Sequence, residues 1–292
     1  MSFMEEIVRI KSVIIAFVIM IFWAGALSAQ TDSVGSSISL KGMSFNGATG
    51  LYSIPSGRVG WEHSANIGLD FGYSLIAGDG QVTHIPKVAV SFLKFIELST
   101  AFDVRPKPDC DQNSDNNLLF GAKFQFPTNN KVAVAIGGNF QVLGLGAKNH
   151  DNHQNHERRN ASQIYVATTY AGNFFEWPSE TTVVIGYTFR EHDAVLYPSS
   201  NVDFGMGFDL VLLPKVFQNI IHFIVDFSNF TYVANPPPPL NAWRGYLNTG
   251  IRIDFAKIIR QEKFKFSADI LMTDAFDANR GFSTGAVFGI GF

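Results

Sequence analysis

Apolar and polar residues alternate with a period of two along most of this chain. The segment ANIGLDFGYSL (65–75) shows the pattern most clearly: every second residue from Ile67 to Leu75 is apolar, and the residues between them are Gly, Asp, Gly and Ser. In an extended strand, successive side chains point to opposite faces. The pattern therefore predicts a strand with one apolar face and one polar or tiny face.

The same alternation recurs in further segments of similar length. They are residues 87–93, 95–105, 118–126, 131–142, 162–170, 182–190, 202–212, 220–228, 247–255, 264–272 and 282–292. Most of them match the roughly 9–11 residues that a tilted strand needs to cross a bilayer. We therefore expect an all-β chain, a transmembrane antiparallel β-barrel of about twelve strands, with eight to ten strands as the alternative count.

Two architectures carry such alternation through a whole chain. In a soluble sandwich or barrel the apolar face points inward, whereas in a membrane barrel it points outward to lipid around a polar lumen. Glycine distinguishes them, because Gly68, Gly121, Gly205 and Gly289 are among many glycines on the polar face. A solvated face disfavours glycine, which weakens strands, whereas a small and crowded lumen needs it. The pattern therefore favours the membrane barrel.

Aromatic residues gather at the strand ends that adjoin the shorter predicted turns. Phe126, Phe174, Trp177 and Phe264 are examples. Outer-membrane barrels carry such aromatic girdles where the membrane meets water. Lipid offers no hydrogen-bond partners to the backbone, so the sheet must close on itself. The long polar connections are expected at the opposite end of the barrel.

The first residues have the composition of an export signal. Arg9 and Lys11 precede the apolar run VIIAFVIMIFWAGA, and small residues follow in AGALSAQ. This arrangement predicts a secretory signal peptide over residues 1–29, with cleavage after Ala26 or Ala29. The alternative is a membrane-anchoring helix, which needs roughly 20 apolar residues, more than this run contains.

The signal peptide and the strand pattern together divide the chain. Residues 30–64 form an N-terminal lead-in, either periplasmic or inserted in the lumen, and residues 65–292 form the barrel. The expected location is the bacterial outer membrane, with membrane lipid as the surrounding partner.

Residues 282–292 resemble the C-terminal strand of bacterial outer-membrane barrels. The resemblance rests on Phe282, Phe288, Ile290 and Phe292. It implies that these four residues are the signal by which barrel-assembly machinery, the expected protein partner, recognises the chain.

A second resemblance lies upstream of the barrel. GATGLYSIPSGRVG (47–60) is similar to the Gly-rich G-x-x-G-L-x-x-x-P opening of barrels of the YjbH type, which are associated with exopolysaccharide secretion. The chain departs from that opening after Pro55, where Ser-Gly replaces Thr-Ala. Small barrels of the OmpW type are a rival resemblance, although they generally have eight strands.

The polar face of the predicted strands carries charges of both signs. Such charges in a barrel make either a hydrophilic path for small solutes or a network of ion pairs that fills a closed lumen. The predicted lumen-lining residues are Asp70, Glu97, Asp103, Arg105, Lys123, Lys131, Gln141, Arg190, Asp209, Asp226, Arg252, Asp254, Lys265 and Asp269.

The remaining chemistry is sparse. A net charge of −3 argues against a nucleic-acid partner. Three histidines at positions 150, 153 and 156 are weak candidates for a metal site, and no cofactor is expected. His222 lies in mid-strand and His192 in a loop, and no serine–histidine motif accompanies either, so we do not expect an enzyme. The three candidate metal ligands are His150, His153 and His156 of the segment NHDNHQNHERRN.

We therefore expect an outer-membrane pore for passive passage of small hydrophilic solutes. The alternative is a closed barrel that acts as a surface adhesin or structural protein through its extracellular loops.

Overall fold

The structure is a computed structural model of the chain. It describes residues 42–62, 65–78, 81–104, 116–127, 131–145, 159–190, 200–230, 245–259, 263–275 and 281–292. The predicted signal peptide lies outside the described residues.

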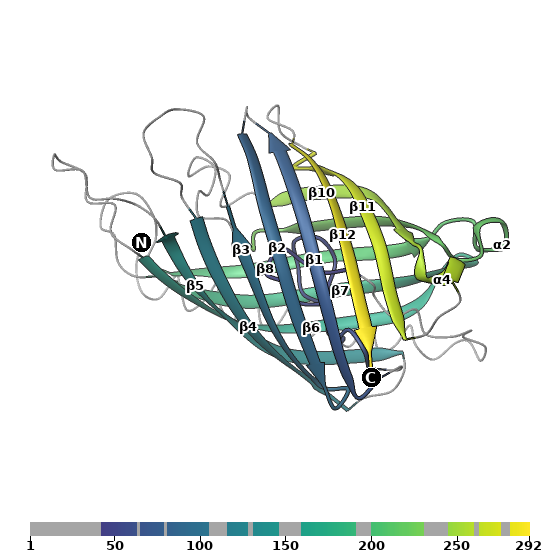
Figure 1. Cartoon of the computed structure of the whole chain (residues 1–292), viewed down its shortest axis with the longest axis horizontal. Helices are drawn as coiled ribbons and strands as arrows, with labels where there is room; N and C mark the ends of the chain where they lie inside the picture. The colour runs from purple at the N-terminus through teal and green to yellow at the C-terminus, as the bar shows by residue number, and fades with distance from the viewer. Residues whose placement is uncertain are drawn as a thin grey trace, which may run out of the picture. The chain divides into compact units, whose positions relative to one another are not determined.

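Twelve strands form one closed antiparallel barrel in which each strand pairs with its neighbours in sequence (Figure 1). The strands are β1 (Ile67–Gly78), β2 (Gln81–Phe92), β3 (Ile96–Asp103), β4 (Asn116–Phe126), β5 (Val132–Leu145), β6 (Arg159–Phe174), β7 (Trp177–Arg190), β8 (Ser200–Val211), β9 (Ile221–Ser228), β10 (Tyr246–Asp254), β11 (Phe264–Thr273) and β12 (Gly281–Gly291). The predicted fold is confirmed, with twelve strands rather than eight or ten.

The last strand closes the barrel against the first. β1 and β12 pair from Gly68 opposite Gly291 to Ala77 opposite Phe282. Beyond this pairing, the Phe292 amide donates a hydrogen bond to the Ile67 carbonyl at 2.8 Å. Because β12 completes the cylinder, the sheet has no unpaired edge. The C-terminal residues are therefore structural members of the wall.

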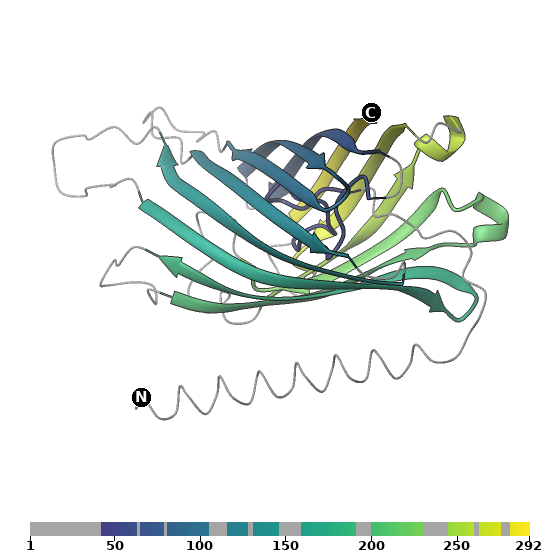
Figure 2. The ribbon, with the colours of Figure 1, turned by 90° about the horizontal axis from the view of Figure 1, so that it is seen from below.

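The connections β2–β3, β4–β5, β6–β7, β8–β9 and β10–β11 lie at one end of the barrel, here called the turn end, which also holds Phe292. Leu93 and Lys94 turn the chain between β2 and β3 with positive φ angles of 54° and 69°. The connections β8–β9 and β10–β11 contain the short helices α2 (Pro214–Phe217) and α4 (Ala256–Ile259). Figure 2 shows both helices, in green and yellow-green, at the same end of the barrel.

The two faces of the wall differ in chemistry. Outward positions carry large apolar side chains that remain exposed, such as Phe71, Ile164, Met206 and Phe288. Inward positions carry charged, hydroxyl, amide and small residues, most of them buried. Among the described residues, no helix is long and apolar enough to cross a membrane.

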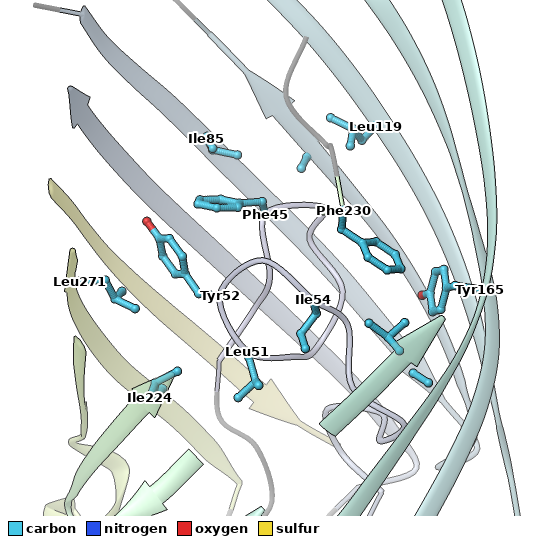
Figure 3. Close-up of a cluster of buried hydrophobic side chains, with 13 residues drawn as sticks. Phe45, Leu51, Tyr52, Ile54, Ile85, Leu119, Tyr165, Ile224, Phe230 and Leu271 are labelled. Carbon is cyan, nitrogen blue, oxygen red and sulfur yellow. The ribbon is translucent and has the colours of Figure 1, made fainter. Parts of the chain in front are cut away.

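Residues 42–62, here called the plug segment, lie inside the barrel (Figures 1 and 3). Every residue of this segment is buried. Its short bridges, Met43 to Thr49 and Gly50 to Pro55, pair the segment with itself and not with a strand of the wall. The plug segment is therefore a compact set of turns enclosed by the sheet.

Glycines of the inner wall make room for the plug segment. A Cβ on Gly68 would lie 2.0 Å from the Trp61 ring, and a Cβ on Gly291 would lie 2.6 Å from it. On the opposite side, a Cβ on Gly205 would lie 2.5 Å from Ile54. Since a side chain at these positions would collide with the plug segment, the glycines on the polar face serve a crowded lumen.

Candidate functional site

Glu97 on β3 anchors the plug segment at one side of the lumen. Its Oε1 accepts a hydrogen bond from the Thr49 amide at 2.8 Å, and its Oε2 accepts from the Thr49 hydroxyl at 2.6 Å and the Gly60 amide at 3.0 Å. Lys123 Nζ on β4 lies 3.0 Å from Glu97 Oε1 and donates to the carbonyl oxygens of Thr49 and Arg58. Backbone groups of the plug segment and the Thr49 hydroxyl thus provide further hydrogen bonds to this buried ion pair.

Asp226 on β9 anchors the opposite side. Its Oδ2 accepts from the amides of Tyr52 and Ser53 at 2.7 and 2.8 Å. Its Oδ1 accepts from the Ser53 hydroxyl at 2.8 Å and from Asn248 Nδ2 at 2.7 Å. The Ser53 hydroxyl also lies 2.8 Å from that of Ser228. One carboxylate therefore takes four donors, three of which belong to the plug segment.

Arg58 links the plug segment to β7. Its Nη1 donates to Glu62 Oε1 at 2.6 Å, and its Nε lies 2.9 Å from Glu180 Oε1. Gln125 on β4 donates to Glu62 and accepts from the Val59 amide at 2.7 Å. These groups are all buried, so each charge is held by partners and not by water.

Trp61 and Lys265 share Asp70 at the end of the plug segment. The indole Nε1 donates to Asp70 Oδ1 at 3.0 Å, and Lys265 Nζ donates to Oδ2 at 2.9 Å. Lys265 Nζ also lies 4.9 Å from the Trp61 ring centroid, a cation–π distance. The indole thus packs between the inner wall of β1 and the ammonium group of β11.

A further ion network belongs to the wall alone. Arg252 binds Asp269 in a bidentate manner, through Nε at 2.7 Å and Nη2 at 3.2 Å, and its Nη1 lies 3.7 Å from Asp209. His222 pairs with Asp209 through Nδ1 at 2.6 Å and with the Asn219 carbonyl through Nε2 at 3.2 Å. Both ring nitrogens of His222 are engaged in fixing the wall.

An apolar belt surrounds the middle of the plug segment (Figure 3). Phe45, Leu51, Tyr52 and Ile54 of the plug segment pack in one cluster, and the Phe45 and Tyr52 rings meet edge to face at 4.3 Å. The other members are Ile85, Ala101, Leu119, Tyr165, Ala167, Val184, Ile224, Phe230 and Leu271. Apolar side chains from several strands thus pack with the middle of the plug segment, and their burial removes apolar surface from water.

Two other predicted lining residues accept hydrogen bonds from residues outside the plug segment. Asp103 accepts a hydrogen bond from Asn117 at 3.2 Å, and Asp254 accepts from the Ala256 amide at 3.1 Å. Gln141 is buried on β5.

Several predicted residues are only partly described or lie beyond the description. Lys131 is half-buried next to β5. Arg105 lies outside the described residues, as does the side chain of Arg190. His150, His153 and His156 also lie outside them, and the described part of the chain holds no group of residues suited to a metal ion.

Some residues of the lumen network were missing from the sequence prediction. Lys87 already lies on the polar face of residues 87–93, and Glu180 continues the inward parity of residues 182–190 by one step, so the alternation marks both positions. Arg58 and Glu62 lie in the plug segment, which has no strand period, and no sequence signal marked them as partners of the wall.

Comparison with known protein families finds no matching family, and comparison with curated proteins finds no match. Comparison with solved structures finds barrels at low identity. The KdgM porin in complex with disordered oligogalacturonate is 8% identical with a TM-score of 0.46, covering 76% of this chain and 99% of its own. Omp33 of Acinetobacter baumannii is 12% identical with a TM-score of 0.40. The match covers 78% of this chain and 98% of Omp33. The β-domain of the Bordetella autotransporter BrkA is 8% identical with a TM-score of 0.41. The match covers 79% of this chain and 100% of the β-domain. These values are too low for an inference about function.

Proposed function

We propose that this chain is a bacterial outer-membrane barrel that passes small hydrophilic solutes through its lumen, and that the plug segment closes the lumen until it moves. The exposed apolar exterior suits lipid, and the polar interior suits water. The residues that hold the plug segment, such as Glu97, Lys123 and Asp226, would line the water-filled path once it leaves.

One observation carries this proposal: the plug segment is held without being part of the sheet. Its polar bonds to the wall run mainly between wall side chains and plug backbone, groups that water can replace. Its β-bridges are internal, so displacement breaks no strand pairing. The apolar belt opposes displacement, which makes the closed state the resting one.

Planar-bilayer conductance of refolded protein tests the proposal. We compare the full chain with a variant that lacks residues 42–62. The full chain should show rare and small openings, and the deletion variant should show stable, ohmic channels. A deletion variant that forms a barrel, as judged by its β-sheet circular dichroism, yet conducts no ions would contradict the pore and favour a closed structural barrel.

The resemblances to YjbH-type and OmpW-type barrels can be compared with the plug segment and the strand count. The segment similar to the opening of YjbH-type barrels, residues 47–60, falls within the plug segment. The OmpW-type alternative is disfavoured, because its barrels generally have eight strands and this one has twelve. Phe282, Phe288, Ile290 and Phe292 are the proposed assembly signal. The adhesin alternative depends on loops that lie largely outside the described residues.

A further inference from the structure

The turn end of the barrel is rich in exposed lysines. Lys94, Lys215 and Lys263 are exposed in three of its connections. Within the described residues of the turn-end connections, Glu176 is the single acidic residue. The described part of this end therefore presents positive charge, although the whole chain has a net charge of −3.

Two neighbouring connections add an exposed apolar ledge, defined here as helices α2 and α4 with Leu213. Val216 and Phe217 on α2 are exposed. Ile258 and Ile259 on α4 are also exposed, and each of these two isoleucines has a relative accessibility of 58%. Lys257 Nζ donates to the Asn219 carbonyl at 2.7 Å and so ties the two connections together. Large apolar side chains thus project from one sector of the turn end.

The ledge continues the outer surface of the barrel. Phe255, which precedes α4, stacks on the ring of Phe266 with centroids 5.1 Å apart. Phe266 faces outward on β11, where Phe264 lies 6.3 Å from the ring of Phe288 on β12. The ledge therefore adjoins the apolar exterior of β11 and β12. Lys215 and Lys263 lie in the same two connections as the ledge, and Lys94 lies in the β2–β3 turn at the same end.

We infer that this ledge and its flanking lysines form a contact site for anionic phospholipid in the membrane leaflet at the turn end. Apolar side chains would enter the interface, and lysines would meet the phosphate groups above it. The inference rests on the membrane placement in the proposed function but not on conduction. The positive charge favours lipid over a soluble protein partner, because Lys215 and Lys263 lie in the connections that carry the ledge and the ledge adjoins the apolar outer wall.

Lipid selectivity tests the site directly. Spin-labelled phosphatidylglycerol and phosphatidylcholine are compared by electron paramagnetic resonance around the full-length protein in membranes. Each lysine near an anionic surface favours association by about fivefold. Wild-type protein should therefore prefer phosphatidylglycerol by at least about threefold, and less so at high salt. The combined change Lys94→Gln, Lys215→Gln and Lys263→Gln should remove the preference.

Glu176→Gln is the matched control, since it removes a charge of opposite sign from the same end. It should keep or raise the preference. Inserted protein without a phosphatidylglycerol preference, or a preference that survives loss of the three lysines, overturns the lipid site while leaving the membrane placement intact. Protein that fails to enter membranes overturns both.

A fluorophore on the ledge supplies a second measurement. An environment-sensitive dye is attached through Ile258→Cys in a Cys110→Ser background. In phosphatidylglycerol vesicles the emission should shift to the blue and be quenched by nitroxide lipids labelled near the headgroup. Emission that remains as in water and is quenched by aqueous iodide overturns the inference, and would leave the ledge open to a soluble protein partner.

Discussion

Ser53 binds both oxygens of Asp226 although 173 positions separate the two residues: its amide donates to Oδ2 and its hydroxyl to Oδ1, each at 2.8 Å. The Tyr52 amide adds a further bond to the same carboxylate. A fixed anion thus orients two successive backbone amides of the plug segment. This arrangement explains how a segment without regular secondary structure keeps one conformation in the lumen.

Asp226→Asn should loosen the plug segment. The NH2 group of Asn takes the place of one carboxylate oxygen, so it faces either the two backbone amides or the donors of Ser53 and Asn248, and at least one buried donor loses its acceptor. We expect a loss of about 1.5–3 kcal/mol in the stability of the closed state. Hydrogen exchange of residues 42–62 measures it, with Glu176→Gln as the control. Unchanged exchange rates would show that the carboxylate does not hold the segment.

A disulfide should lock the closed state. The hydroxyls of Ser53 and Ser228 lie 2.8 Å apart, which brings the two side chains close enough to test a bridge. We expect the variant Ser53→Cys with Ser228→Cys, in a Cys110→Ser background, to lose all openings on oxidation and to regain them on reduction. Bilayer conductance gives the readout. Conductance that is indifferent to the redox state, once mass spectrometry confirms the bridge, would rule out a path blocked by the plug segment.

Two glycines of β12 should differ in their tolerance of a methyl group. A Cβ at Gly289 would lie 2.0 Å from Asp70 Oδ1 and 2.9 Å from the Trp61 ring, whereas at Gly285 the nearest atom is 3.1 Å away. We expect Gly289→Ala to destabilise the folded protein by about 1–3 kcal/mol through overpacking, and Gly285→Ala to cost clearly less. Urea unfolding in detergent compares them. Equal costs would mean that Trp61 does not pack against this strand.

The Glu97–Lys123 pair should behave as a coupled unit. Lys123→Met leaves the Glu97 carboxylate buried without its cation and should cost about 3–5 kcal/mol in stability. Adding Glu97→Leu to that variant should recover part of the loss, because no uncompensated charge remains. A double-mutant cycle from urea unfolding measures the coupling. Strict additivity of the two changes would refute the pairing.

Arg252 should set ion selectivity once the lumen is open. In the variant that lacks residues 42–62, Arg252→Gln leaves Asp269 and Asp209 without their cation, so the path becomes more negative. We expect the reversal potential in a salt gradient to move toward cation preference. Lys215→Gln, on the exposed surface of the turn end, is the matched control and should leave selectivity unchanged. The same shift in both variants would argue that Arg252 does not line the path.

The strands were predictable because the wall separates two environments. Lipid-facing and lumen-facing residues alternate along each strand, so the sequence of a single strand shows which of its side chains point outward and which point inward. Residues 67–75 are an example. The glycines on the polar face also indicated a crowded lumen before the occupant was known. The occupant itself is not predictable from the sequence, since residues 42–62 have no period and fit a periplasmic or a lumen-inserted position equally.

The sequence by itself thus determined the all-β barrel and the polarity of its two faces, because alternation is a local property that a single strand can display. The tertiary structure alone decided that the plug segment fills the lumen and which charges hold it. Those contacts join residues as far apart as Tyr52 and Asp226, and a pairing of that kind depends on closure of the sheet around the segment.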